Sequence, residues 1–161
     1  MGMNVTSDAY ARYADGYIAL LHTKCTRGLF SPRLFKAVAN GVEKYYPLEK
    51  IEWMKEFLND TNQQIAAGCL ECLVSHGMKL GDITDLIEAR KDDRIFSHMV
   101  IDLATKLNDP DTLLIFVDED SAYLNKVILA LKGTGNESYL TSLMLSDNQN
   151  LAMAVNRIIG K

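Results

Sequence analysis

Three stretches of the chain can be written one above another at a constant offset of 27 residues: DLIEARKDDRIFSHMVIDLATKL from Asp85, TLLIFVDEDSAYLNKVILALKGT from Thr112, and YLTSLMLSDNQNLAMAVNRIIGK from Tyr139. Similar residues then fall in the same columns. The clearest columns are Leu86, Leu113 and Leu140; Asp93, Asp120 and Asp147; and Ile101, Ile128 and Val155. Self-similarity at a short fixed period is typical of repeat architectures, in which each unit packs mainly on its neighbours.

Each unit is predicted to be a pair of short helices. Apolar residues recur at steps of three and four on both sides of the repeated aspartate, which is a helical spacing. The aspartate is expected to begin the second helix, where its carboxylate would accept a hydrogen bond from a first-turn N–H and favour the positive end of the helix dipole. An earlier unit fits if about five residues are inserted in the loop at 76–82. Its matching positions are Met54, Thr61 (a weaker cap), Cys69 and Cys72.

Two further helices are expected ahead of the repeats. The first runs from about Ser7 to Lys24, with Ser7 or Asp8 as its cap. One broad apolar face of it carries Tyr10, Tyr13, Ala14, Tyr17, Ile18 and Leu21. The second begins at Ser31-Pro32, where proline suits the first helical turn. It is expected to turn Leu34, Phe35, Val38 and Val42 inward before Tyr45-Tyr46-Pro47 ends it. Because the first repeat of a stack has an exposed apolar edge, this pair is interpreted as a cap.

The predicted fold is therefore one all-α domain, a right-handed α-solenoid of about four helix-turn-helix repeats with an N-terminal capping helix pair. The capping pair spans 1–48, and the repeats span 49–80, 81–108, 109–134 and 135–161. Over roughly residues 50–161, the short units with an acidic residue before the second helix and a glycine or small residue at the end resemble HEAT-like repeats of the short variety. The resemblance implies a concave face, lined by second helices, that is presented to another protein.

Composition limits the function classes. The 161 residues are 48% hydrophobic, enough for one packed domain. No apolar run is long enough to cross a membrane, so a cytoplasmic protein without a membrane partner is expected. Residues 1–50 hold seven basic and four acidic side chains, a balance of +3, which leaves −7 for the remainder. Because nucleic-acid affinity depends mainly on Lys and Arg, this acidic balance argues against a nucleic-acid partner.

One set of residues supports an alternative function. The spacing Cys69-x-x-Cys72 followed by His76, together with His22-x-x-Cys25, contains thiols and imidazoles that zinc prefers. A helical metal-binding or redox protein is therefore the competing hypothesis. Against it, Cys69 and Cys72 fall in columns that hold Ile101 and Ala104 in the next unit, and a buried cysteine behaves as a small hydrophobic residue. Core packing is the favoured interpretation of these cysteines.

Two other groups of residues could have a chemical role, a histidine–aspartate pair and two acidic clusters. His98 and Asp102 are one helical turn apart, which would allow an acid–base pair, although such pairs are usually surface ion pairs. The acidic clusters Asp92-Asp93 and Asp118-Glu119-Asp120 align by the repeat offset. They would form a ridge able to hold a basic peptide or a divalent cation, or would serve only for capping and solubility.

The sequence therefore predicts a non-enzymatic protein–protein interaction module, an adaptor, scaffold or assembly factor that needs no cofactor. The expected partner is another protein. The residues predicted to contact it vary between repeats and lie on the second helices: Arg94, His98, Asp102, Asn125, Lys126, Met153 and Arg157. The last repeat ends at Ile158-Ile159-Gly160-Lys161 without a cap, and two alternatives stay open for its apolar edge: it mediates a homodimer, or it was trimmed from a longer stack.

Overall fold

The computed structural model describes residues 2–118 and 120–160, with side chains from residue 9 onward. Within those ranges the chain is helical and contains no strand, which confirms the all-α class. The helices, in chain order, are α1 (Gly2–Thr26), α2 (Pro32–Ala39), α3 (Leu48–Ile51), η1 (Glu52–Asn59), α4 (Gln63–Ser75), η2 (Leu80–Ile83), α5 (Thr84–Ala89), α6 (Arg94–Lys106), α7 (Pro110–Leu114), α8 (Leu124–Gly133), α9 (Glu137–Met144) and α10 (Gln149–Ile159). The elements η1 and η2 are 3-10 helices.

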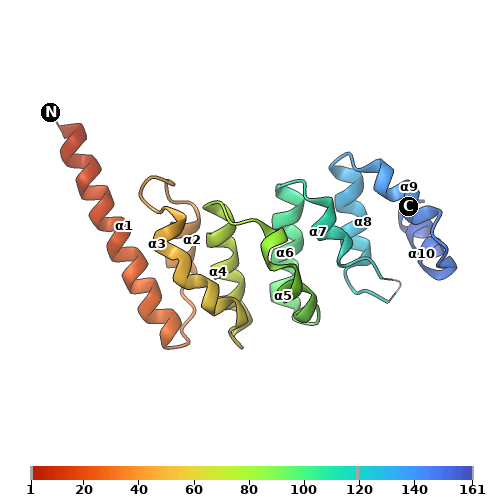
Figure 1. Cartoon of the computed structure of the whole chain (residues 1–161), viewed down its shortest axis with the longest axis horizontal. Helices are drawn as coiled ribbons and strands as arrows, with labels where there is room; N and C mark the ends of the chain where they lie inside the picture. Colours follow the sequence, from red (N-terminus) through yellow and green to blue (C-terminus); the bar gives the residue numbers. More distant parts are fainter. Residues whose placement is uncertain (1, 119, 161) are drawn as a thin grey trace.

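The helices form an elongated row in which the order in space follows the order in the chain (Figure 1). Helix α1 lies at one end and α9 and α10 at the other. Contacts run along the row from α2 to α4, from α4 to α6, from α6 to α8 and from α8 to α10. The shorter elements η1, α7 and α9 pack beside these helices. Nothing in the described ranges is both long and apolar enough to act as a membrane-spanning helix.

The core columns predicted from the repeat are confirmed. Ile101, Ile128 and Val155 are fully buried on α6, α8 and α10. Leu113 and Leu140 are buried as well, whereas Leu86 is half-buried. In the earlier unit, Met54, Cys69 and Cys72 are inaccessible to solvent, so the cysteines do occupy core positions. These residues belong to one continuous hydrophobic cluster that extends from α1 to α10.

The predicted capping residues are wrong. Asp93 stands at the start of α6, but its Oδ2 accepts a hydrogen bond from Arg90 Nε at 2.6 Å, and its side chain caps no backbone N–H. Asp120 precedes α8 by several residues, because that helix begins only at Leu124. The residues that do cap are the asparagines next to the other two predicted positions. Asn62 caps α4 in place of Thr61, and Asn148 caps α10 in place of Asp147.

The position of the Arg90 side chain explains why Asp93 does not cap α6. Its Nη1 donates to the carbonyl oxygen of Leu58, at the end of η1, and its guanidinium lies 4.8 Å from the centroid of the Phe96 ring. Arg90 thus links the turn before α6 to the preceding unit. A carboxylate beside a half-buried guanidinium is stabilised by the charge-assisted bond, so Asp93 turns toward Arg90 and away from the helix.

The first two helices also differ from the prediction. Helix α1 begins at Gly2, so Ser7 and Asp8 lie within it and not at its cap. Ala14, Ile18 and Leu21 are buried as expected, but Tyr10, Tyr13 and Tyr17 are exposed. The reason is that α1 lies at the end of the row and leans away from it toward its own N-terminus (Figure 1). Its contacts with Trp53 of η1 and Cys69 of α4 come from its C-terminal half, at His22 and Cys25. Only the small and aliphatic half of the broad apolar face is therefore covered.

Helix α2 ends at Ala39, earlier than predicted, and Val42 is 56% exposed instead of buried. The cause lies in the following turn, where the ring of Tyr46 rests directly on Gly41. A Cβ atom at position 41 would lie 2.3 Å from that ring. The chain turns at this glycine, which buries Tyr46 and leaves Val42 facing outward.

The contact between α2 and α4 depends on another glycine. A Cβ atom placed on Gly68 in α4 would lie 2.8 Å from the buried ring of Phe35, whereas one on Gly16 in α1 would meet nothing within 4 Å. Both glycines lie inside helices, where alanine is intrinsically favoured by about 1 kcal/mol.

We therefore expect opposite effects from the same substitution. Gly16→Ala should raise the free energy of unfolding by roughly 0.5–1 kcal/mol. Gly68→Ala should lower it by about 1 kcal/mol or more, because displacing Phe35 from its packed position outweighs the helix propensity gained. Urea unfolding followed by circular dichroism measures both. Equal stabilisation by the two variants would show that α2 and α4 do not approach closely.

Candidate functional site

The predicted contact residues lie on the second helix of each unit. Arg94, His98 and Asp102 are on α6, Asn125 and Lys126 on α8, and Met153 and Arg157 on α10. His98 and Lys126 are half-buried, and the other five are exposed. The buried columns of the same helices contain none of them. Whether a partner binds there stays a prediction, but all seven side chains are accessible to one.

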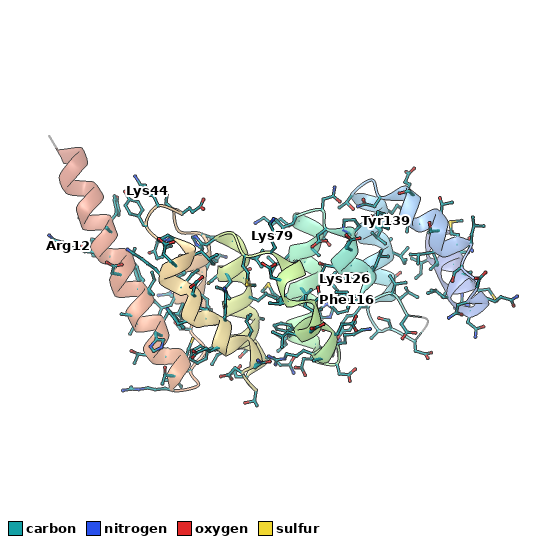
Figure 2. The ribbon with its side chains drawn as sticks, viewed as in Figure 1. Arg12, Lys44, Lys79, Phe116, Lys126 and Tyr139 are labelled. Atoms are coloured by element: carbon teal, nitrogen blue, oxygen red, sulfur yellow. The ribbon has the colours of Figure 1, made fainter. Side chains whose placement is uncertain are left out.

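The ammonium group of Lys126 contacts two of the other predicted residues, Asp102 and His98. Lys126 Nζ, near the middle of the row in Figure 2, lies 2.8 Å from Asp102 Oδ1 and 3.1 Å from His98 Nδ1. The ring of His98 also contacts the ring of Tyr123 edge-on, with centroids 5.2 Å apart. The lysine therefore connects α8 to two successive turns of α6. Asp102 is bonded to this lysine, whereas the sequence had paired it with His98.

The environment of His98 favours the neutral imidazole. Its pKa is lowered, first by partial burial and then by the positive charges of Lys126 and Arg94, while Asp102 acts in the opposite direction. The ammonium of Lys126 can donate to Nδ1 only when that nitrogen carries no proton. A general acid would need a raised pKa near neutrality, so this geometry does not set up the acid–base pair considered from the sequence.

A shallow groove lies beside this bridge, where α6 faces α4 and α2. Ile95 and Met99 form its rim on α6, one turn apart, and Ile95 is 47% exposed. The groove has a volume of about 390 Å³ and reaches across α4 to α2 and the loop before it. Its other lining residues are Phe30, Pro32, Phe35, Lys36, Asn40, Gln64, Ala67, Gly68 and Glu71.

Sequence reasoning did not identify this groove. Ile95 and Met99 were available as a signal, because they are apolar residues four apart that fall outside the buried stripe of Phe96, Val100 and Ala104. The residues at the same two positions in the other repeats do not form the same apolar pair. Gly68 and Phe35 both line the groove, and the close approach of the Phe35 ring to the backbone of Gly68 is visible only in the packed structure.

The five residues of the alternative metal site do not form one cluster, although two of them, Cys25 and Cys69, are in contact. His22 is exposed and stacks edge-on against Trp53, with centroids 4.7 Å apart. His76 is buried, and its Nε2 bonds the carbonyl oxygen of Val38 at 2.6 Å. Cys72 Sγ donates to the carbonyl oxygen of Phe35. Across residues 2–118 and 120–160, no three His, Cys, Asp or Glu side chains are placed to share a metal ion.

The other two thiols, Cys25 on α1 and Cys69 on α4, form a hydrogen bond with each other. The bond lowers the pKa of Cys25, which accepts it, and raises the pKa of Cys69, which burial raises further. Burial also raises the pKa of Cys72. Because thiolates are the reactive form and all three side chains are buried, these cysteines are placed as core residues.

The two acidic clusters do meet along one edge. Asp92 lines a hollow of about 500 Å³ together with Asp118 and Asp120, as the repeat offset predicted, while Glu119 lies outside the described residues. Lys91 and Arg94 line the same hollow, so its charge is mixed. Basic side chains among the carboxylates oppose cation binding there.

Comparison with known proteins gives no further identification: no known family, no curated protein and no solved structure matches this chain.

The bridge made by Lys126 predicts a titration shift. Removing its charge in Lys126→Met should raise the pKa of His98, because one cause of the lowered value is lost and the opposing effect of Asp102 remains. The matched control is Lys132→Met, an exposed lysine on the same helix. NMR titration of the His98 ring protons measures the pKa. An unchanged His98 pKa in Lys126→Met would show that the lysine does not contact the imidazole.

The buried cysteines predict a protection pattern. With Ellman's reagent, the native protein should show no rapidly reacting thiol, and three thiols should react once it is unfolded, because Cys25, Cys69 and Cys72 are each almost inaccessible. Metal analysis of protein purified without chelator is the paired measurement. One zinc per chain, with a melting temperature that falls on adding chelator, would restore the metal-binding hypothesis.

Proposed function

We propose that this chain is a non-enzymatic protein-binding module, an adaptor or assembly factor whose architecture is a right-handed α-solenoid of about four HEAT-like helix pairs capped by α1 and α2. The serial packing of α2, α4, α6, α8 and α10 supports the solenoid, because in such proteins each unit contacts only its neighbours. The partner is another protein.

The observation that carries the proposal is the division of α6 into two faces. Phe96, Val100 and Ala104 are fully buried, whereas Ile95, His98 and Asp102 project from the other side. A helix turn that is fixed by its core on one side can vary freely on the other, as recognition surfaces on repeat scaffolds do. Exposed apolar residues beside a polar cluster are also the composition of an interface core and its rim.

The partner-binding face is proposed to extend from Ile95 and Met99, at the groove, through the bridge of His98, Asp102 and Lys126 to the exposed residues of α10. The apolar groove would supply most of the buried area. The bridge presents both signs of charge, of which Asp102 is the more exposed, and such rim charges affect partner choice and association rate more than affinity.

A homodimer through the last repeat remains part of the proposal. Leu145 is 78% exposed and Met153 is 63% exposed, so α9 and α10 present aliphatic surface at the end of the row. Large exposed apolar residues on a terminal unit are typical of a contact surface. If this edge dimerises, the part of the face on α6 stays accessible because α6 lies in the middle of the row (Figure 1), whereas Met153 on α10 would be covered by the second copy.

The test compares two quadruple variants of matched composition. The face variant combines Arg94→Ala, Ile95→Ser, Met153→Ser and Arg157→Ala, all at exposed positions. The control variant makes the same kinds of change in the loop after α1 and at the end of α6. It combines Arg27→Ala, Leu29→Ser, Lys106→Ala and Leu107→Ser, which are also exposed.

Wild type and both variants are used to capture proteins from the source cell, and any protein captured is then purified and titrated by calorimetry. We expect affinity to fall at least tenfold for the face variant alone, with each substitution changing stability by no more than about 0.5 kcal/mol. Equal affinity for the face and control variants would contradict the proposed face. Loss of folding in the face variant would mean that these residues belong to the core.

A further inference from the structure

A second surface, independent of the face on α6, lies at the opposite end of the row from α10. It is the groove between α1 and the loop that follows α2, with a volume of about 660 Å³. Half of the ten residues that line it are tyrosines. Three of them come from α1 (Tyr10, Tyr13 and Tyr17), and two come from the loop (Tyr45 and Tyr46).

The groove is held open by features already described. Tyr46 is fixed on Gly41, and α1 diverges from the row toward its N-terminus (Figure 1). The rings of Tyr10 and Tyr45 have centroids 5.9 Å apart and are tilted by 47°. Burial raises the pKa of Tyr46, and the nearby Tyr17 contributes to that increase, which places these two hydroxyls in one environment. The groove is thus bounded by aromatic rings on both sides.

We propose that this groove, named here the tyrosine groove, binds a proline-rich segment of another protein in the polyproline II conformation, with acidic residues next to the prolines. Grooves lined by aromatic rings are the usual receptors for such segments, because flat rings pack against pyrrolidine rings and the stiff ligand loses little entropy on binding. Polyproline II carbonyl groups have no internal partners, and tyrosine hydroxyls and the Asn40 amide in the groove are donors for them.

The spacing of the rings agrees with this ligand. Tyr10 and Tyr17 are seven residues apart on α1, which is a rise of about 10 Å. One turn of polyproline II advances about 9 Å. A proline segment lying along α1 would therefore meet one of these two rings at each turn, with Tyr13 between them.

Charge selects the acidic flank. Lys44 is the one charged residue among those that line the groove, and its Nζ lies 4.6 Å from the centroid of the Tyr45 ring (Figure 2). Residues 1–50, which include every residue that lines the groove, also carry a net charge of +3. A carboxylate beside the prolines would pair with this ammonium group.

A helix, including α1 of a second copy of this chain, fits the groove less well. Its backbone carbonyl groups are already bonded, so it offers fewer acceptors to the exposed hydroxyls of Tyr13 and Tyr17 and to the Asn40 amide. Aliphatic pockets, which such a helix needs for its leucine-type side chains, are limited to Ala37 and Val42.

The experiment uses the full chain and three synthetic peptides: decaproline with two glutamates at its N-terminus, decaproline without them, and a glycine–serine peptide that carries the same glutamates. Binding is measured by calorimetry, and the site by backbone NMR shifts. We expect saturable binding of the acidic decaproline peptide, weaker binding of plain decaproline and none of the glycine–serine peptide. Shifts should be confined to α1 and the loop after α2.

The variants are Tyr13→Ser, which is 66% exposed and so does not threaten folding, Tyr17→Ser and Lys44→Glu, with Leu107→Ser after α6, which is 53% exposed and far from the groove, as the matched control. Each tyrosine variant should weaken binding roughly tenfold, as expected for an aromatic contact residue. Lys44→Glu should abolish the preference for the acidic peptide, and Leu107→Ser should leave binding unchanged.

Absence of saturable binding, or equal binding of the glycine–serine peptide, would overturn the proposal. Sedimentation decides the remaining alternative. A dimer that dissociates in Tyr13→Ser and persists in Leu107→Ser would assign the groove to a second copy of this chain, and would also overturn the proposal. None of these outcomes depends on the face of α6, so the two proposals succeed or fail separately.

Discussion

The structure depends on the packing of each second helix against the next. None of α4, α6, α8 and α10 is longer than 13 residues, and short helices have little stability of their own in water. Each gains its stability by burying an apolar stripe against its neighbours, and the continuous core cluster is the sum of those contacts. A row built in this way has two ends, and the outermost helix at each end is covered on one side only. The exposed tyrosines of α1 and the exposed Leu145 and Met153 follow directly from that constraint.

The same constraint explains which features the sequence could predict. The columns of Ile101, Ile128 and Val155 were predictable because the core requires an apolar residue at a fixed place in every unit, and the period makes that requirement visible. Capping residues do not have to stand at a fixed place in every unit. A helix can begin one to three residues earlier or later without moving its buried stripe, so Asn62 and Asn148 cap where the aligned Thr61 and Asp147 were expected. Asp93 fails to cap α6 for another reason, because its carboxylate forms an ion pair with Arg90, which is a stronger partner than a backbone N–H.

The helical periodicity predicted the wrong burial for the tyrosines of α1. Its ring is apolar and its hydroxyl is polar, so a helical stripe of Tyr10, Tyr13 and Tyr17 is compatible with a core or with a wet surface. The burial of each ring is decided by what lies opposite it, and α1, at the end of the row, diverges from its neighbours toward its own N-terminus (Figure 1). The groove on α6 was also not predictable, because the residues of α2, α4 and α6 that line it come together only in the packed structure. For the candidate sites, therefore, the sequence identified the exposed polar positions, and the packing was needed to find the hollows.

The two ends of the row differ in chemistry, and that difference bears on what each can bind. At the α1 end the groove is lined by tyrosines and a lysine, whereas at the α10 end the large exposed apolar residues are Leu145 and Met153. A ligand with unbonded backbone carbonyl groups gains hydrogen bonds at the first end and would lose its water without compensation at the second. A helix, with its carbonyl groups already bonded, has the opposite preference. Under the two proposals, the ends of the row would thus select ligands of different backbone conformation, with the proposed face of α6 between them.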